Sequence, residues 1–170
     1  TRDLCVSFPS VGGRVEALSG LNLDVPRGSV VGFLGPNGAG KTTTIHVLLG
    51  FTSPTSGSAS IFGRDVGSSI ARERIGYLPE HPLTYGFMTG RELLVMAGRL
   101  FMMDRKRLAD AAERLLSLVS LAAAADRRIS TYSRGMMQRI GLAQALVNDP
   151  DLVILDEPTG GLDPIGRMDI

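Results

Sequence analysis

The first residues that could do chemistry form a glycine-rich run from Gly35 to Thr42. The run fits the pattern G-x-x-x-x-G-K-[ST], with an apolar segment before it and a helical pattern after it. Glycines let the backbone wrap so tightly that successive N–H groups converge on phosphate oxygens, and the N-terminus of the next helix adds roughly half a positive charge. The run therefore predicts a polyphosphate site.

Three side chains at the end of this run extend the prediction. Lys41 would reach the β- and γ-phosphates as a point charge, and the Thr42 hydroxyl would complete a Mg²⁺ site. Thr43 would add a hydroxyl or N–H contact to phosphate. The residues predicted to contact the phosphates are Gly35, Pro36, Asn37, Gly38, Ala39, Gly40, Lys41, Thr42 and Thr43.

A pair of acidic residues is the second chemical feature. Asp156 and Glu157 follow the apolar run Leu152 to Leu155, which is typical of a central parallel strand covered on both faces. Side chains at the carboxyl end of such a strand lie where α/β sheets bind their ligands. Asp156 is suited to hold Mg²⁺ through a water, and Glu157 is suited to polarise an attacking water as general base.

Short apolar or alternating segments predict strands around these features. Leu4 to Phe8 and Leu21 to Val25 indicate antiparallel strands separated by the Gly12-Gly13 turn. The apolar run Ser29 to Leu34 predicts the strand that leads into the glycine-rich loop. Two further strands are predicted at Ala59 to Phe62 and Ile75 to Leu78.

Helical periodicity fills the middle of the chain. Thr89 and Glu92 have the spacing of a capping box, and a helix of about 13 residues follows them. An amphipathic pattern from Leu108 to Val119 predicts a second helix, and a third begins near Arg134. A strand, loop and helix unit, a helical insert and a return to the sheet together predict an α/β fold.

Composition limits the classes of partner and compartment. Lys and Arg number 18 against 17 for Asp and Glu, so no global charge attracts nucleic acid or an anionic lipid surface. The single Cys5 fits a reducing compartment. No run approaches the roughly 18 apolar residues that cross a bilayer, and no signal-peptide pattern is present, so we expect a cytoplasmic protein with a peripheral membrane role.

The ends of the sequence indicate a fragment. The chain begins at Thr1 without an initiator methionine, and it stops at Ile170 inside what resembles a continuing motif. We therefore expect a chain truncated at both ends.

Two further segments carry a resemblance to a known family. Tyr132 to Arg139 resembles the signature of ABC transporter ATP-binding domains, and Pro158 to Pro164 looks like the loop after the catalytic glutamate in that family. The order of phosphate loop, signature, carboxylate pair and final loop covers almost the whole chain. The resemblance implies a P-loop NTPase (RecA-like) core with a small antiparallel β lobe and an inserted α-helical subdomain.

The resemblance also implies a working mode. It implies ATP and Mg²⁺ as cofactors, and ATP hydrolysis that drives solute export through separate membrane permease subunits. In that family two nucleotide-binding domains pair head to tail, so Ser133, Gly135 and Met136 would contact the nucleotide held by the partner domain, and Asp163 joins the nucleotide-binding set. A serine hydroxyl and N–H groups at a helix N-terminus form a second anion site, which one nucleotide can share only if two chains meet.

The chain departs from the common family pattern at several positions. Arg134 and Met136 replace the usual Gly and Gln, as in a branch resembling the ATPases of ABC-2 type drug, sodium and polysaccharide exporters. Glu80 stands where the family has Gln, and its carboxylate would bind Mg²⁺ or order the catalytic water. Phe8 falls where the family stacks an aromatic ring on adenine, with a core phenylalanine as the alternative. The switch histidine is expected beyond Ile170.

The expected organisation is one partial nucleotide-binding domain over residues 1–170. The β lobe and P-loop core would span 1–83, the helical subdomain 84–140, and the return to the core 141–170. The helical lobe would receive a membrane subunit through Tyr85, Phe87 and Met88, and local packing is the alternative for these three residues.

Other classes of nucleotide-binding protein fit less well. A small-molecule kinase has no reason to hold the signature, and the short separation of Lys41 from Ser133 excludes the coiled-coil arm of a chromosome or repair ATPase. We expect no nucleic acid partner. The alternative that stays open is a cassette of a soluble, translation-associated ABC ATPase.

Overall fold

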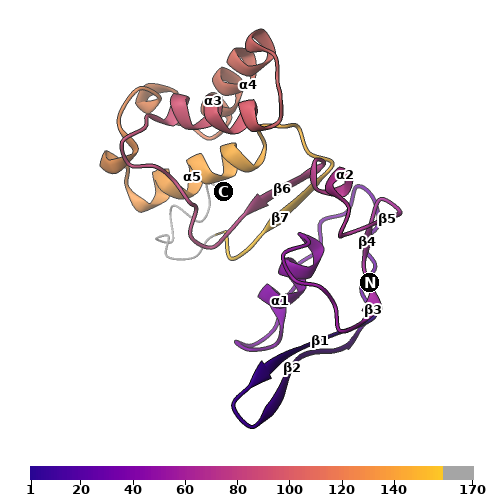
Figure 1. Cartoon of the computed structure of the whole chain (residues 1–170). Helices are drawn as coiled ribbons and strands as arrows, with labels where there is room; N and C mark the ends of the chain where they lie inside the picture. The colour runs from indigo at the N-terminus through magenta and orange to yellow at the C-terminus, as the bar shows by residue number, and fades with distance from the viewer. Residues whose placement is uncertain (159–170) are drawn as a thin grey trace. The chain divides into compact units, whose positions relative to one another are not determined.

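The computed structural model of the chain describes residues 1–158 (Figure 1). The chain divides into two compact units, Thr1–Arg72 and Glu73–Ile170. The first unit contains mainly short strands and one longer helix, and the second contains three longer helices and a pair of parallel strands. This mixture of helices and strands confirms the predicted α/β class.

An antiparallel sheet forms the β lobe of the first unit. β1 (Arg2–Ser10) pairs with β2 (Gly13–Leu21) on one side and with β3 (Ser56–Ser58) on the other. The predicted Gly12-Gly13 turn is confirmed, but the bounds Leu21 to Val25 for the second strand are wrong. Both turn glycines have positive φ, so the chain reverses at once and pairing starts directly after the turn.

Short elements complete the first unit. α1 (Lys41–Leu48) follows the glycine-rich run and buries Ile45 and Val47. A small hairpin and a single helical turn lie further along the chain. They are β4 (Ser60–Ile61), β5 (Arg64–Asp65) and α2 (Ser69–Arg72).

The strand predicted from Ser29 to Leu34 is wrong for the described structure, which assigns no strand to this segment. Val30 and Leu34 are 102% and 92% exposed. A strand needs neighbours that exchange ladder hydrogen bonds with it, and within the first unit the segment pairs with none of the three strands of the β lobe. Apolar composition indicates a tendency to be buried but does not supply the neighbouring strand.

Two parallel strands form the sheet of the second unit. β6 (Ile75–Leu78) pairs in register with β7 (Leu152–Leu155), so both strands are confirmed where the sequence predicts them. The prediction that β7 is a central strand covered on both faces is wrong for the described residues, because β6 is its one strand neighbour there. Val153 and Leu155 remain 37% and 39% exposed.

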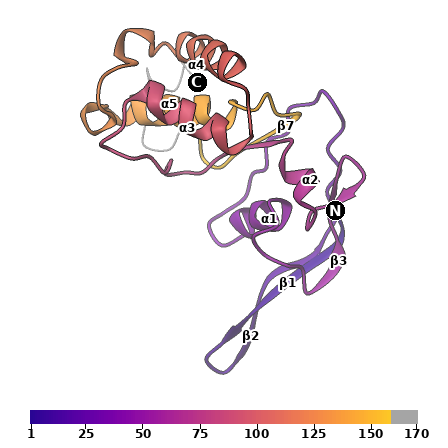
Figure 2. The same cartoon turned by 45° about the horizontal axis from the view of Figure 1, so that its top comes forward.

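Three helices pack together in the second unit (Figure 2). α3 (Gly90–Leu100) begins with the predicted capping box, in which Thr89 N donates to Glu92 Oε2 at 2.8 Å and Glu92 N donates to Thr89 Oγ1 at 3.2 Å. α4 (Arg105–Leu118) and α5 (Arg134–Ala145) confirm the other two predicted helices. The buried core residues are Leu93, Leu94, Ala97, Ala112, Leu115, Leu116, Val119, Leu121, Ala125, Ile129, Ile140, Ala143 and Val147.

The connection from α3 to α4 is short, whereas the connection from α4 to α5 is longer and contains 3-10 turns at Ala122–Ala124 and Ile129–Thr131. Arg91 of α3 links the connection to the helices, because its Nε donates to Asp126 Oδ1 at 2.8 Å and its guanidinium also pairs with Glu113 of α4. The Arg91 guanidinium lowers the pKa of the Asp126 carboxyl. The ion pairs therefore connect three segments of the helical layer.

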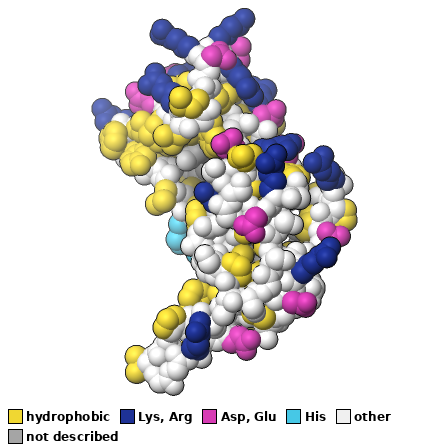
Figure 3. Space-filling view, turned by 45° about the vertical axis from the view of Figure 1, so that its right-hand side comes forward, with side chains coloured by type: hydrophobic (Ala, Val, Ile, Leu, Met, Phe, Trp, Pro, Cys, Tyr) yellow, Lys and Arg dark blue, Asp and Glu magenta, His cyan; other side chains and the backbone are white. Residues whose placement is uncertain are grey.

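α4 is amphipathic, with its polar face turned to solvent. Arg105, Lys106 and Arg107 are exposed in its first turn, and Figure 3 shows Lys and Arg side chains projecting from the surface of the helical unit. Of the helices within residues 1–158, none combines the length and the apolar composition that a membrane span requires.

A substitution in the helical core tests this packing. Leu115 is 0% exposed, so Leu115→Ala should lower the free energy of unfolding by about 2–5 kcal/mol through lost apolar burial and a cavity. Leu118→Ala, on the same helix but 63% exposed, should change it by less than about 0.5 kcal/mol. Urea denaturation followed by circular dichroism measures both, and equal losses would contradict the packing described here.

Candidate functional site

The glycine-rich loop leads into α1 without a side-chain cap. Gly40 occupies the N-cap position in a left-handed conformation, and the first turn of α1 contains no acidic residue. The positive end of the helix dipole is therefore not offset by a carboxylate of its own first turn. Lys41 Nζ donates to Gly35 O at 2.6 Å and to Pro36 O at 3.0 Å, so the ammonium group is held over the loop that precedes it. The loop thus concentrates positive charge where the sequence predicts phosphate binding.

Two glycines of the loop require left-handed backbone. Gly38 and Gly40 have φ of 82° and 85°. A Cβ on Gly40 would lie 2.6 Å from Ala17 O and would overlap the Leu18 side chain, whereas a Cβ on Gly38 would meet nothing within 4 Å. The loop is therefore pressed against β2 at Gly40 and open at Gly38.

Thr44 is a supporting residue that the sequence analysis missed. Its side chain is 1% exposed, and its Oγ1 donates to Gly40 O at 2.9 Å. This bond ties the last glycine of the loop to the first full turn of α1. The sequence contains a signal for this bond. Thr44 is the third of three consecutive threonines and lies one helical turn after Gly40, where its hydroxyl can donate to the carbonyl four residues earlier.

The parallel register of β6 and β7 brings the predicted carboxylates to one edge of the sheet. Leu78 pairs with Leu155, and Asp156 N donates to Leu78 O at 2.9 Å, so the ladder continues one residue past the strands. Glu80 and Glu157 therefore leave the sheet at the same carboxyl edge. We call this set, Glu80, Asp156 and Glu157, the carboxylate edge.

The carboxylate edge affects the pKa of a neighbouring side chain and contains a residue with unusual backbone geometry. Burial raises the pKa of the Tyr77 phenol, and the negative charge of Asp156 raises it further. Glu157 has φ of 48°, a left-handed conformation that costs a non-glycine residue about 1–3 kcal/mol. Glu80 is 54% exposed and lies 3.9 Å from the exposed imidazole of His81.

The signature segment forms the N-terminus of α5. Ser133 is the N-cap, and its Oγ accepts a hydrogen bond from Met136 N at 3.3 Å. Ser133 is exposed, so its hydroxyl hydrogen can still be donated to a ligand. The Met136 side chain packs against the helical core, which leaves the backbone as its means of contacting a nucleotide.

The remaining predicted residues lie as follows. Phe8 is 41% exposed on β1, so the alternative of a core phenylalanine is wrong, and Thr42 is exposed at the start of α1. Gly135 is half-buried in the first turn of α5. Asp163 lies outside the described residues. Among residues 1–158, no group of three or more His, Cys, Asp or Glu side chains could hold a metal ion unaided.

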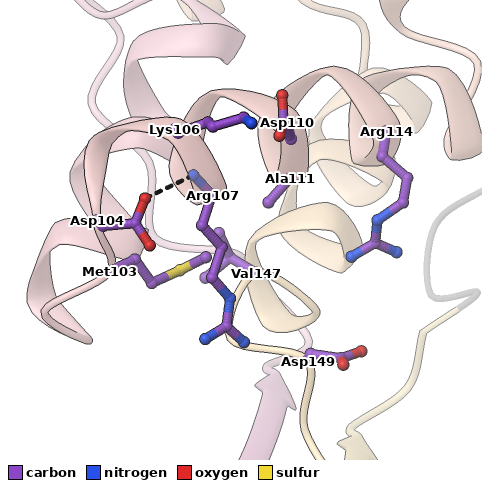
Figure 4. A pocket seen from close by; sticks show the side chains of 9 residues that line it. All are labelled: Met103, Asp104, Lys106, Arg107, Asp110, Ala111, Arg114, Val147 and Asp149. Carbon is purple, nitrogen blue, oxygen red and sulfur yellow. Dashed lines mark hydrogen bonds between the residues drawn. The ribbon is translucent and has the colours of Figure 1, made fainter.

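A cavity in the second unit is lined by none of the predicted site residues. Its volume is about 410 Å³. Figure 4 shows the Arg107 side chain passing Val147, and the side chains of Arg107 and Arg114 both extending from α4 on the side of Asp149. Basic and acidic side chains alternate around this cavity, so its lining has no strong preference for a polyanion. The lining residues are Met103, Asp104, Lys106, Arg107, Asp110, Ala111, Arg114, Val147 and Asp149.

The contrast between the two loop glycines gives a direct test of the loop. Gly38→Ala should cost about 1–2 kcal/mol of unfolding free energy, because alanine disfavours left-handed backbone. Gly40→Ala should cost about 1–3 kcal/mol more, because its methyl group also overlaps β2. Chemical denaturation of the two variants compares these costs. Equal costs would show that the contact between Gly40 and β2 is absent in solution.

Comparisons with known proteins agree with the fold and the motifs. A family described as ABC transporter matches residues 18–160. An uncharacterised ABC transporter ATP-binding protein of Nostoc sp. is 45% identical over 156 residues, which are 91% of this chain and 47% of the relative. A Nod factor export ATP-binding protein of Rhizobium sp. is 42% identical over 152 residues, which are 88% of this chain and 50% of the relative. The chain thus spans about half the length of these relatives.

A solved structure extends the comparison to the fold. The ATP-binding subunit of an ABC transporter superposes with a TM-score of 0.83 at 30% identity, over 99% of this chain and 69% of that one. This likeness confirms the predicted P-loop NTPase fold, and the relatives do not favour a translation-associated ATPase. Since the family match covers most of the sequence and includes the phosphate loop, the signature and the carboxylate pair, this chain belongs to the ABC transporter family, among its ATP-binding proteins.

Proposed function

We propose that this chain binds ATP with Mg²⁺ and hydrolyses it to drive the export of a solute through membrane partners. The observation that carries the proposal is the phosphate loop, where Lys41 Nζ lies over the loop carbonyls and the N-terminus of α1 has no acidic residue of its own. A triphosphate supplies the negative charge that this loop is built to accept.

The nucleotide-binding set combines the loop with residues from other elements. Lys41 exchanges its two bonds to loop carbonyls for bonds to the β- and γ-phosphates, and Thr43 adds a contact. The exposed ring of Phe8 stacks on adenine. The loop amides of residues 35–43 hold the remaining phosphate oxygens.

The donors proposed for Mg²⁺ fit that ion. Thr42 offers a hydroxyl oxygen, and Asp156 and Glu80 offer carboxylate oxygens, which are the hard ligands that Mg²⁺ prefers. Mg²⁺ usually takes one or two carboxylates and completes its shell with waters and substrate phosphates, and this set matches that number. Bound there, the ion would neutralise charge on the phosphates.

Glu157 is the proposed general base. Its position directly after Asp156 keeps the two carboxylates on one edge of the sheet while the positive φ turns the backbone between them. Glu157 accepts a proton from water as the water oxygen bonds to the γ-phosphorus and the bond to the β-phosphate oxygen breaks, which yields ADP and phosphate. Glu80 orders the same water from the neighbouring loop.

The signature helix is proposed to act on a second copy or a related domain. The hydroxyl of Ser133 and the N–H groups of Gly135 and Met136 lie at the exposed N-terminus of α5 and fit a γ-phosphate. Head-to-tail pairing of two nucleotide-binding domains lets one nucleotide use both sites, and Asp163 joins that interface. ATP then stabilises the dimer, and hydrolysis releases it.

Coupling to membrane permease subunits is proposed for the loop before α3. Tyr85 and Phe87 are 50% and 69% exposed, with ring centroids 5.8 Å apart. Met88 is different, because it packs against the helical core and local packing accounts for it. Relatives include a Nod factor export ATP-binding protein, which supports export and a location at the cytoplasmic face of the membrane.

The proposed organisation keeps the boundaries expected from the sequence. Residues 1–83 supply the β lobe and the phosphate loop, residues 84–140 the helical subdomain with the signature, and residues 141–170 the return to the core. The described helices α3 and α4 fall within the second segment, which supports its helical character, whereas α5 crosses the boundary at residue 140.

Loss of the loop cation tests nucleotide binding. In the full-length protein that contains this chain, Lys41→Ala should weaken Mg-ATP binding by about tenfold or more, because it removes charge-assisted hydrogen bonds to phosphate. Lys106→Ala, which removes the exposed lysine of α4, is the matched control and should leave affinity unchanged. Isothermal titration calorimetry measures both, and normal affinity in Lys41→Ala would remove the basis of the proposal.

Loss of the base tests hydrolysis separately. Glu157→Gln should keep Mg-ATP binding but slow phosphate release by about 10²- to 10⁴-fold, since glutamine cannot accept the proton. Size-exclusion chromatography with ATP should show the variant trapped as a dimer. Glu16→Gln on exposed β2 serves as the control, and unchanged phosphate release in Glu157→Gln would refute the assignment of the base.

A further inference from the structure

Gln138 is a buried side chain whose amide has no hydrogen-bond partner in the part of the chain that the structure describes. The residue is 4% exposed, and its Nε2 has neither a protein acceptor nor contact with solvent. Buried donors are nearly always bonded, because water would otherwise satisfy them in the unfolded chain. An unbonded donor at this depth requires an acceptor that residues 1–158 do not supply in this structure.

The contacts of α5 place Gln138 beside the loop that follows β6. A Cβ on Gly76 would collide with Ala145 O, and a Cβ on Gly141 would lie 2.7 Å from Pro82 and 2.9 Å from Leu78. One face of α5 therefore runs along β6 from Ala145 toward the carboxyl end of the strand. Gln138 is on that face one turn beyond Gly141, because residues three apart are neighbours on a helix.

A second contact is made by the neighbouring residue of α5. Thr84 Oγ1 lies 3.9 Å from Met137 Sδ, so the end of the loop passes over this turn of α5. Helical side chains lean toward the N-terminus of their own helix, so the Gln138 amide reaches from Gly141 toward Ser133. From these contacts we expect the amide to lie between the N-terminus of α5 and the loop that carries Glu80.

We infer that Gln138 is a positioning residue: its side-chain amide donates to a carboxylate or carbonyl oxygen of the loop 79–84 when Mg-ATP is bound, and it thereby fixes Glu80 relative to the signature end of α5. The inference rests on the proposed ATPase function. It assigns a role to a residue that contacts neither nucleotide nor metal.

If Gln138 had only a structural role, an apolar substitution would have a different effect on turnover. If Gln138 served packing alone, an apolar side chain of the same volume would relieve the unbonded donor, stabilise the protein and leave turnover intact. If Gln138 is a positioning residue, stability and turnover change in opposite directions, because the same substitution stabilises the nucleotide-free protein and slows ATP hydrolysis.

The decisive variant is Gln138→Met in the full-length protein, with Gln138→Leu as a second apolar variant if the first does not fold. We expect an unfolding midpoint at or above that of wild type, a Kd for Mg-ATP within about twofold, and a kcat lowered about tenfold or more through misplacement of Glu80. Gln144→Met on the half-buried side of the same helix is the matched control and should behave as wild type.

Amide hydrogen exchange of residues 79–84 provides a readout independent of turnover. Mg-ATP should protect this loop in wild type and in Gln144→Met but not in Gln138→Met. Equal protection in all three proteins, or wild-type kcat in both apolar variants, would overturn the inference. If the wild-type protein binds Mg-ATP without hydrolysing it, the proposed function is wrong. The protection of residues 79–84 by Mg-ATP would then still test the role of Gln138.

Discussion

The parallel pairing of β6 with β7 is the constraint on which the rest of the second unit depends. Because both strands run in the same direction, the residues that follow them emerge at one edge, and the bond from Asp156 N to Leu78 O fixes their relative height. Parallel neighbours cannot be joined by a tight turn and need a long crossover. Here the crossover contains α3, α4 and α5, so the helical layer is a consequence of the same pairing that gathers the carboxylate edge.

α5 connects the signature residues with the strand that leads to Glu80, because a single helix contributes to both. Its N-terminus presents Ser133, and its body lies so close to β6 that side chains at Gly76 and Gly141 would collide with the neighbouring segment. A contact this close cannot slide by small amounts, since packed interiors do not deform continuously. A ligand that moves the N-terminus of α5 would therefore also move the loop after β6. Gly76 and Gly141 allow the close contact between α5 and β6 through which this movement would pass.

Local signals were enough to predict much of this chain. The phosphate loop, the Thr89 capping box and α4 each follow from residues within a few positions of one another, and the structure has all three. Predictions that needed a distant partner had mixed outcomes: β6 and β7 pair where their sequences predict strands, but other such predictions failed or were absent. The segment Ser29 to Leu34 has the composition of a strand without a strand neighbour in its unit, and the unbonded amide of Gln138 has no signature in sequence, because it depends on what α5 lies against.

Electrostatics explains why a third carboxylate at this edge is compatible with the proposed function. Glu80, Asp156 and Glu157 follow two paired parallel strands at one edge of the sheet, and the charge of Asp156 adds to the effect of burial in raising the pKa of Tyr77. If Glu80 binds a divalent cation as proposed, its carboxylate adds negative charge where the family has a neutral glutamine, and the free energy gained on cation binding is larger. In the proposed function, this added charge would couple the order of the loop 79–84 to the metal more strongly than a neutral amide would, so a donor that holds this loop, such as Gln138, would have a larger effect.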